Sequence, residues 1–334
     1  MNTMNYSKVF GSQIFDTDVK FLKCIEFHSD GVTELPSDLK VEKLIINSCS
    51  ANVHIPILNH LIELTIRTEK NSICTFAGGS KLKVIRYYNN MFSEKINITI
   101  PIVLPSLESL YINNCIVKTI EMYNNLFEII VSKCVIDLIK FNDIEVLDIK
   151  ESDIKQIEEA KLIFNLRMQD CVKTPSISLL RVSHLELIRC FHHSHLSIKQ
   201  DLQTLFIDKC GITNISDIPY LDHLHFSGSN LEKIYNLPKM KVCIIENDNG
   251  TKLKIINGFP SLQHLSLSDF PNIDVQYLPR LMEIYLYFCN ITNVENLSRQ
   301  SSLENWSKDK APNGLRFLLY ACKEENEVSF PNEY

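Results

Sequence analysis

Apolar side chains recur along this chain at fixed positions, which we call slots. In the segment 202–218, LQTLFIDKCGITNISDI, they occupy slots one, four, six, nine, eleven, fourteen and seventeen. The segment that begins at Leu281 fills the same slots, with Cys289 again in the ninth. The segments that begin at Leu221 and Ile144 also fit, with serine in the ninth slot. A pattern shared by separate segments indicates an internal repeat.

Fourteen repeats fit this template. Their first slots lie at residues 22, 41, 61, 82, 107, 126, 144, 163, 182, 202, 221, 240, 262 and 281, so that the steps between them are 18–25 residues. Slots four and six alternate as in a strand with one buried face. After slot nine the apolar spacing lengthens to about three, which is typical of a tight turn or a short 3₁₀ segment. Each repeat therefore predicts one coil, made of a strand, a bend and a compact return.

The slot pattern resembles the leucine-rich-repeat signature L-x-x-L-x-L-x-x-N/C-x-L from Leu22 to Leu297. The resemblance implies a leucine-rich-repeat solenoid of about fourteen coils of 18–25 residues. Its curved, single parallel β-sheet would form the concave side, and short 3₁₀ or extended returns would form the convex side. The repeats are short for the family, and the ninth slot holds cysteine in seven of them. Those cysteines are Cys49, Cys115, Cys134, Cys171, Cys190, Cys210 and Cys289.

One repeat is too small to bury a core, whereas stacked repeats share a continuous one. The predicted organisation is an N-terminal cap at 1–21, the solenoid at 22–300, and a degenerate repeat, cap and tail at 301–334. Val9, Phe10, Ile14 and Phe15 are the candidate capping side chains at the first end, and Trp306 lies in the last segment. In the family the ninth-slot residue turns inward at the bend. Because cysteine is small and readily buried, we interpret these thiols as core residues rather than metal ligands.

Composition narrows the classes of partner. With a net charge of −6 over 334 residues, the chain has no basic excess that would favour nucleic acid or an anionic membrane. The first twenty residues contain no sustained apolar run, and the eleven cysteines include no C-x-x-C pair. We therefore expect a cytoplasmic protein with reduced thiols, no cofactor and a monomeric state.

Two groups of histidines are candidates for metal ligands. His192, His193 and His195 follow the predicted strand of the ninth repeat, and near-consecutive residues in a turn rarely converge on one ion. We predict a solvated turn there. His184, His223 and His264 occupy slot three and His225 occupies slot five, where side chains point away from the core. Surface histidines or pH-sensitive contacts are the preferred interpretation, with metal binding as the alternative.

Odd slots around the strand should face solvent, and some of them hold residue types that are enriched at protein interfaces. The candidate partner-binding residues are Arg67, Arg86, Tyr88, Tyr111, Arg167, Phe206, His223, His225, Tyr285 and Tyr287. The first four form one predicted cluster. Asp148, Arg167 and Glu186 fall in slot five of consecutive repeats, so mutual neutralisation is an alternative explanation for Arg167.

These features favour a non-catalytic scaffold that binds a protein partner on the concave face. The resemblance suggests, as an alternative, a regulatory or adaptor subunit of a phosphatase or ubiquitin ligase. A third hypothesis is a parallel β-helix enzyme acting on polysaccharide, which would need strands on several sides of each coil. No nucleophile elbow, phosphate-binding loop, zinc-protease or dinucleotide motif is found.

Overall fold

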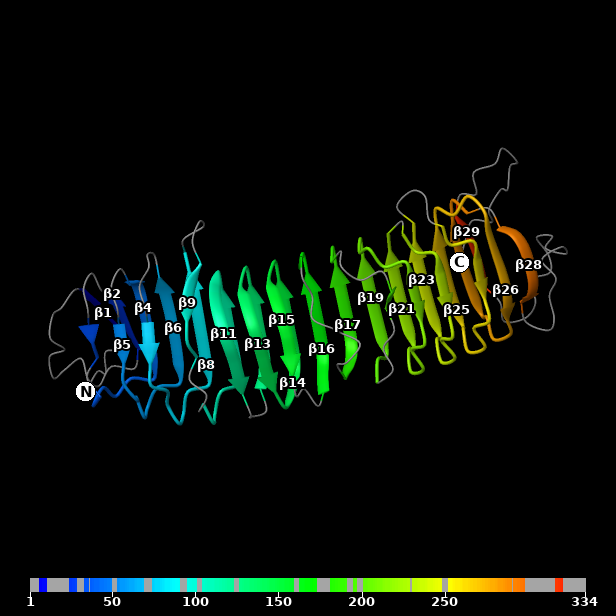
Figure 1. The fold of residues 1–334 in the computed structure, drawn as a ribbon. Helices are drawn as coiled ribbons and strands as arrows, with labels where there is room; N and C mark the ends of the chain where they lie inside the picture. Colours follow the sequence, from blue (N-terminus) through cyan, green and yellow to red (C-terminus); the bar gives the residue numbers. More distant parts are fainter. Residues whose placement is uncertain are drawn as a thin grey trace. The chain divides into compact units, whose positions relative to one another are not determined.

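The computed structural model describes most of the chain in two compact units, Met1–His192 and His193–Tyr334. The described residues are 6–10, 24–28, 33–35, 37–49, 53–68, 74–90, 95–100, 104–122, 126–158, 162–172, 181–190, 195–196, 201–228, 230–247, 252–289, 291–297 and 316–320. Within these ranges the only regular elements are parallel strands, and no helix occurs. Each unit is therefore a parallel β-solenoid (Figure 1).

In unit 1 one strand from each coil joins a large parallel sheet, which we call the front sheet. Its strands, in spatial order, are β1 (Tyr6–Phe10), β2 (Cys24–His28), β4 (Lys43–Cys49), β6 (Glu63–Thr68), β8 (Val84–Asn89), β10 (Ser109–Asn113), β12 (Leu126–Ser132), β14 (Asp143–Lys150), β16 (Leu162–Gln169) and β17 (Val182–Ile188). Spatial order follows chain order, as expected when every coil stacks on the one before it. Tyr111 pairs with Arg86 on one side and with Ile130 on the other, so equal slots lie in register.

The return segments of unit 1 also form sheets, which we call return sheets. One contains β3 (Thr33–Glu34), β5 (Val53–Ile55) and β7 (Cys74–Phe76), and the other contains β9 (Ile96–Ile98), β11 (Cys115–Met122), β13 (Val135–Phe141) and β15 (Asp153–Glu158). The expectation of a single sheet was wrong. Of the two forms expected for the returns, 3₁₀ or extended, the extended form occurs as strands, and the described residues contain no 3₁₀ segment. Coils of nearly equal length place their returns in register as well, so the backbone groups of the returns can pair with each other.

Unit 2 repeats this arrangement. Its front sheet contains β19 (Thr204–Asp208), β21 (His223–Ser227), β23 (Val242–Glu246), β25 (His264–Ser268), β27 (Glu283–Tyr287) and β29 (Arg316–Tyr320). Its return sheets contain β18 (His195–Leu196), β20 (Asn214–Ser216) and β22 (Lys233–Tyr235), and β24 (Ile255–Asn257), β26 (Ile273–Leu278) and β28 (Ile291–Leu297).

The turn predicted for the three neighbouring histidines was wrong at His195. This residue begins β18 and pairs with Asn214, while buried Leu196 pairs with Ile215. The apolar return slot that follows His195 draws its backbone into the return sheet. His192 and His193 lie outside the described residues.

The predicted inward slots do form the core. Every described side chain in slots four and six is at most 3% exposed. The ninth-slot cysteines whose side chains are described, all but Cys49, are at most 6% exposed. The predictions of inward slots and of buried thiols are therefore confirmed for the described residues.

A left-handed residue in slot eight turns each central coil from the front sheet into its return. In unit 1 these residues are Asn114, Lys133, Glu151, Asp170 and Arg189, with φ values of 54°, 55°, 45°, 54° and 49°. Such a conformation is unfavourable for residues other than glycine, so it requires local compensation. The bend supplies a hydrogen bond from the slot-eight N–H to the next coil, as from Lys133 N to Lys150 O at 2.9 Å.

The buried thiol in slot nine forms hydrogen bonds with backbone carbonyl groups at this bend. Cys134 Sγ donates to Ser132 O at 3.1 Å and approaches Ile112 O of the preceding coil at 3.6 Å. Ser152 takes the same place one coil later, where its hydroxyl donates to Lys150 O at 2.6 Å and accepts from Cys134 N at 3.0 Å. A small side chain with a hydrogen-bonding atom is what this position requires.

At the two ends, β1 pairs with β2 and β29 pairs with β27, so each is the last strand of its front sheet. Val9 and Phe10 lie in β1. Ile14, Phe15 and Trp306 lie outside the described residues. The domain boundaries remain predictions.

Candidate functional site

The outer face of the front sheet in unit 1 carries the densest group of candidate residues. Odd slots point away from the core because successive side chains of a strand alternate between the two faces. Thr65, Arg86 and Tyr111 therefore form one row across β6, β8 and β10, in register. Arg67 and Tyr88 pair in the next row. The predicted cluster of Arg67, Arg86, Tyr88 and Tyr111 is thus brought together on three adjacent strands.

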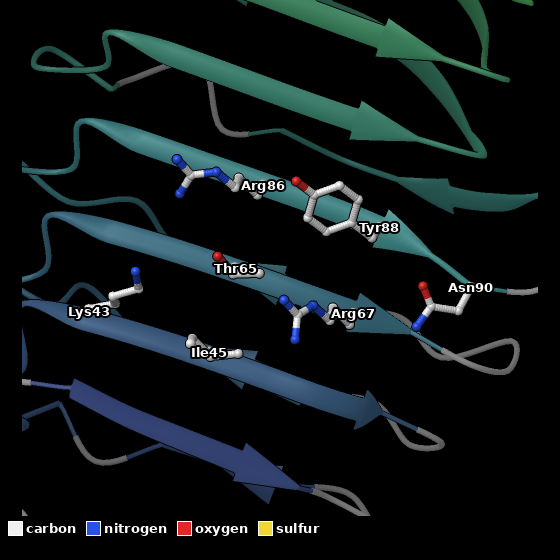
Figure 2. Close-up of a pocket in the computed structure, with 7 residues that line it drawn as sticks. All are labelled: Lys43, Ile45, Thr65, Arg67, Arg86, Tyr88 and Asn90. Atoms are coloured by element: carbon white, nitrogen blue, oxygen red, sulfur yellow. The ribbon is translucent and has the colours of Figure 1, made fainter. Parts of the chain in front are cut away.

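A shallow hollow of about 500 Å³ lies on this face. It is lined by Lys43, Ile45, Thr65, Arg67, Arg86, Tyr88 and Asn90. Figure 2 shows that β4, β6 and β8 each contribute two of these side chains, with Asn90 just beyond the end of β8. We call it the basic hollow, because its charged lining residues are one lysine and two arginines.

One carboxylate, that of Glu63, forms ion pairs with two of these cations. Glu63 Oε2 lies 3.1 Å from Lys43 Nζ and 3.4 Å from Arg86 Nη1. All three side chains are about one-third exposed or more, so these ion pairs contribute little to folding stability. Their effect is to hold the lysine and the arginine on either side of β6.

Arg86 also lies over an aromatic ring. Its guanidinium carbon is 5.1 Å from the centroid of Tyr111, which is within the range of a cation–π contact. The Tyr111 hydroxyl donates to Glu128 Oε1. Burial and this carboxylate raise the pKa of Tyr111, so the phenol stays protonated and the ring remains a neutral platform for Arg86.

Arg67 is exposed and has different surroundings. Its Nη1 donates to Asn47 Oδ1 at 3.2 Å, and Asn47 Nδ2 in turn donates to Glu26. Among the described residues, no carboxylate forms an ion pair with Arg67. The guanidinium has five N–H donors, and a single bond to a neutral amide leaves most of them available to a ligand.

Arg167, farther along unit 1, is in part explained by its neighbours. Its Nε lies 3.3 Å from Glu186 Oε2, as the neutralisation hypothesis predicts. Asp148 is in register with Arg167, but its carboxylate forms its ion pair with Lys150 of the same strand, at 3.1 Å. Neutralisation therefore occurs in two separate pairs, and Arg167 lies outside the basic hollow.

Unit 2 holds the remaining candidates on the outer face of its front sheet. The rings of Phe206 and His225 meet edge to face with centroids 4.7 Å apart, and His225 Nε2 lies 3.6 Å from Glu246. His223 lies 3.5 Å from Asp222. These histidines pair with different carboxylates, Asp222 just before β21 and Glu246 on the neighbouring β23, and do not share one.

The tyrosines of β27 lie near a third such pair. Glu283 Oε2 is 3.0 Å from His264 Nδ1 and accepts from the Tyr285 hydroxyl at 3.0 Å. Tyr287, two residues farther along β27, is half-buried. In unit 1, the rings of His184 and Phe164 pack edge to face with their centroids 4.8 Å apart. Across the described part of the chain, no three His, Cys, Asp or Glu side chains gather as a metal site would require.

The sequence analysis missed four members of the basic hollow and the carboxylate beside it. Lys43 and Glu63 both occupy slot three of consecutive repeats. Opposite charges in equal slots could have been used to predict that the two side chains form an ion pair. Ile45 and Thr65 occupy slot five, which was already predicted to face outward. Asn90 occupies the ninth slot of the fourth repeat, which the pattern places inward, whereas the structure leaves its side chain exposed.

No protein-family model, curated protein or solved structure matches this chain. Among the residues that the structure describes, no helix has the length and apolar character needed to cross a membrane.

Proposed function

We propose that this chain is a non-catalytic scaffold that binds a protein partner on the outer face of the front sheet in unit 1. The proposal includes a leucine-rich-repeat type of coil, about fourteen coils in all, with this sheet on the concave side. It also places the protein in the cytoplasm as a monomer without a cofactor, where the buried free cysteines would stay reduced.

The observation that carries the proposal is the basic hollow with the adjoining Arg86–Tyr111 contact. The core of unit 1 lies on the opposite side of the sheet, so folding does not require arginine and tyrosine side chains to gather here. Arginine and tyrosine are the residue types that most often anchor protein interfaces. A regular sheet holds them in fixed positions, which reduces the conformational entropy lost when a partner binds.

A regulatory or adaptor subunit of a phosphatase or ubiquitin ligase is a narrower form of the same proposal. It adds an enzyme to the complex and uses the same face. Recovery of such an enzyme among the captured partners would support it.

A second candidate function, a polysaccharide-active β-helix enzyme, is favoured by the return sheets. That hypothesis needs strands on more than one side of each coil, and β11, β13 and β15 provide them. A lyase assay on acidic polysaccharides tests it directly, because turnover would replace the scaffold proposal and Arg67→Ala would then lower the rate.

Site-specific photocrosslinking tests the scaffold proposal. A benzoylphenylalanine residue replaces Tyr88 in the hollow or, as a matched control, exposed Lys118 on β11 of the return sheet. The protein is then irradiated in extracts of the cells that produce it. We expect discrete protein adducts from position 88 and none of the same mass from position 118. Equal adducts from both positions, or none from position 88, would contradict the proposal.

A further inference from the structure

We infer that the basic hollow recognises an acidic peptide segment in which carboxylate side chains alternate with apolar ones. This inference rests on the proposed function and names the chemistry of the partner. It follows from the charges that line the hollow, from its apolar surface and from its size.

The charges select an anion. Lys43, Arg67 and Arg86 bring three positive charges to one surface, and Glu63 pairs with two of them, Lys43 and Arg86. The excess is positive in a chain whose net charge is −6. Since like charges on the rest of the surface repel an acidic ligand, this hollow is a favourable place for it to dock.

Arg67 is the residue best placed to make the specific contact. Lys43 and Arg86 already share Glu63, whereas the described contact of Arg67 is a neutral amide. A planar guanidinium can donate two parallel hydrogen bonds to one carboxylate, which adds geometric specificity to the charge attraction. Lys43 and Arg86 then supply longer-range attraction on either side.

The apolar part of the lining sets the second requirement. Ile45 lies on β4 and the Tyr88 ring lies on β8, so aliphatic and aromatic surface accompanies the cations (Figure 2). A volume of about 500 Å³ exceeds what one carboxylate fills and admits a neighbouring apolar side chain as well. An alternating acidic and apolar peptide meets both conditions.

Glu63 also argues for carboxylates over a phosphate group. A phosphate near neutral pH carries close to two negative charges. Glu63 occupies the space between Lys43 and Arg86, so a dianion there would face a carboxylate as well as the two cations. Singly charged carboxylates spaced along a peptide can reach Arg67 without concentrating charge at Glu63.

Fluorescence anisotropy with defined peptides tests the inference. The probe is a labelled hexapeptide of alternating glutamate and leucine, titrated with the full chain. Matched hexapeptides replace glutamate by glutamine or by lysine. We expect binding of the glutamate peptide alone, with an affinity that falls as salt is added. Arg67→Glu should weaken binding by about tenfold or more, because it removes two charge-assisted hydrogen bonds and adds repulsion.

Lys118→Glu is the control variant, since it makes the same change of net charge on the return sheet of the same unit. It should leave the affinity within about twofold, and far-ultraviolet circular dichroism should be unchanged in both variants. Equal binding of the glutamine peptide would overturn the inference. So would an equal loss in the Lys118→Glu variant, or competition by inorganic phosphate at a concentration where matched chloride has no effect.

The two proposals fail in different ways. Specific adducts from position 88 together with no binding of the glutamate peptide would overturn the acidic-peptide inference and leave the scaffold function standing. Binding of the peptide through Arg67 without adducts from position 88 would instead contradict the proposed scaffold function.

Discussion

The returns of two regions, residues 115–158 in unit 1 and residues 214–257 in unit 2, differ although the front-sheet strands beside them are alike. In unit 1 the central returns β11, β13 and β15 are strands of eight, seven and six residues. In unit 2 the returns β20, β22 and β24 are strands of three residues. Both sets enclose a core of the same slots, so the length of the return strand is set by something other than the apolar pattern.

A turn that contains proline follows each of these three short returns. Pro219, Pro238 and Pro260 follow them, each after a left-handed residue and one apolar residue. Proline has no N–H for a strand ladder and fixes the φ angle of a turn. The turn then closes with a backbone hydrogen bond, as from Leu221 N to Ile218 O at 3.3 Å. Residues 115–158 contain no proline, and there the returns extend into longer strands.

The comparison shows that the inward positions do not depend on the backbone pairing of the return. Slots eleven and fourteen are buried in both regions, by Val117 and Ile120 in unit 1 and by Ile212 and Ile215 in unit 2. Coil stacking needs apolar side chains at these positions. Whether the backbone between them forms a long strand or a turn is decided locally.

A buried charge should have the largest effect, and a similar one in both units. Leu205 on β19 and Leu147 on β14 are 0% exposed, so Leu205→Asp or Leu147→Asp places a carboxylate in the core with no partner. We expect each to cost several kcal/mol, about 3–5, and to unfold the coils around it. Urea unfolding followed by circular dichroism measures the loss. Thr204→Asp, on the outer face of β19, is the matched control and should unfold near the wild-type midpoint.

Introducing a proline into a long return of unit 1 should have the next largest effect, and removing one from a turn of unit 2 is the comparison. Leu138→Pro removes an N–H from β13, which is paired on both sides, and should cost about 2–3 kcal/mol. Pro219→Ala relaxes a turn outside any strand and should cost about 0.5 kcal/mol. Denaturant midpoints measure both. Equal losses would show that the return sheet of unit 1 adds no stability beyond that of a turn.

Raising the pH should destabilise the protein through its buried thiols. Burial raises the pKa of Cys134 from 9.0 to about 11 and that of Cys243 in unit 2 to about 12. A raised folded-state pKa means that stability is complete below about pH 9 and is lost as the pH rises toward the folded value. For Cys134 the loss is up to about 3 kcal/mol, at 1.4 kcal/mol per unit of pKa.

Denaturant unfolding between about pH 8 and pH 11 measures this loss. Cys134→Ser should flatten the pH dependence, because serine does not titrate there and Ser152 already occupies the equivalent slot one coil later. A Cys243→Ser variant should remove a loss that also begins near pH 9 but continues to about pH 12. An unchanged slope in the Cys134→Ser protein would exclude ionisation of Cys134 as a cause of the loss.

Outer-face tyrosines should have the smallest effect on stability. Tyr285→Ala combined with Tyr287→Ala should change the free energy of unfolding by about 0.5 kcal/mol or less, since the inward slots of β27 are untouched. If the binding surface extends into unit 2, partner capture should weaken. Capture that is lost with Arg67→Glu and kept with the tyrosine variant would confine the surface to unit 1.

Much of the fold could be predicted from the sequence, and the reason is the repeat. Slots four and six recur so often that the burial of Leu147 and Leu205 followed from spacing, whereas the burial of Cys134 was what the resemblance to leucine-rich repeats implied. The candidate site was harder to predict from the sequence. Arg86 and Tyr111 were predicted to be neighbours because equal slots stack, but the position of Glu63 between Lys43 and Arg86 depends on side-chain conformations that no spacing encodes.

Taken alone, the order of apolar and polar residues determined which side chains face inward, which strands are neighbours and in what register, because a one-residue slip would move every apolar side chain to the solvent face. Only the tertiary structure decided how the returns pair. Their backbone groups have no fixed partner until neighbouring coils of equal length lie beside them, and β11 and β13 then form a second sheet.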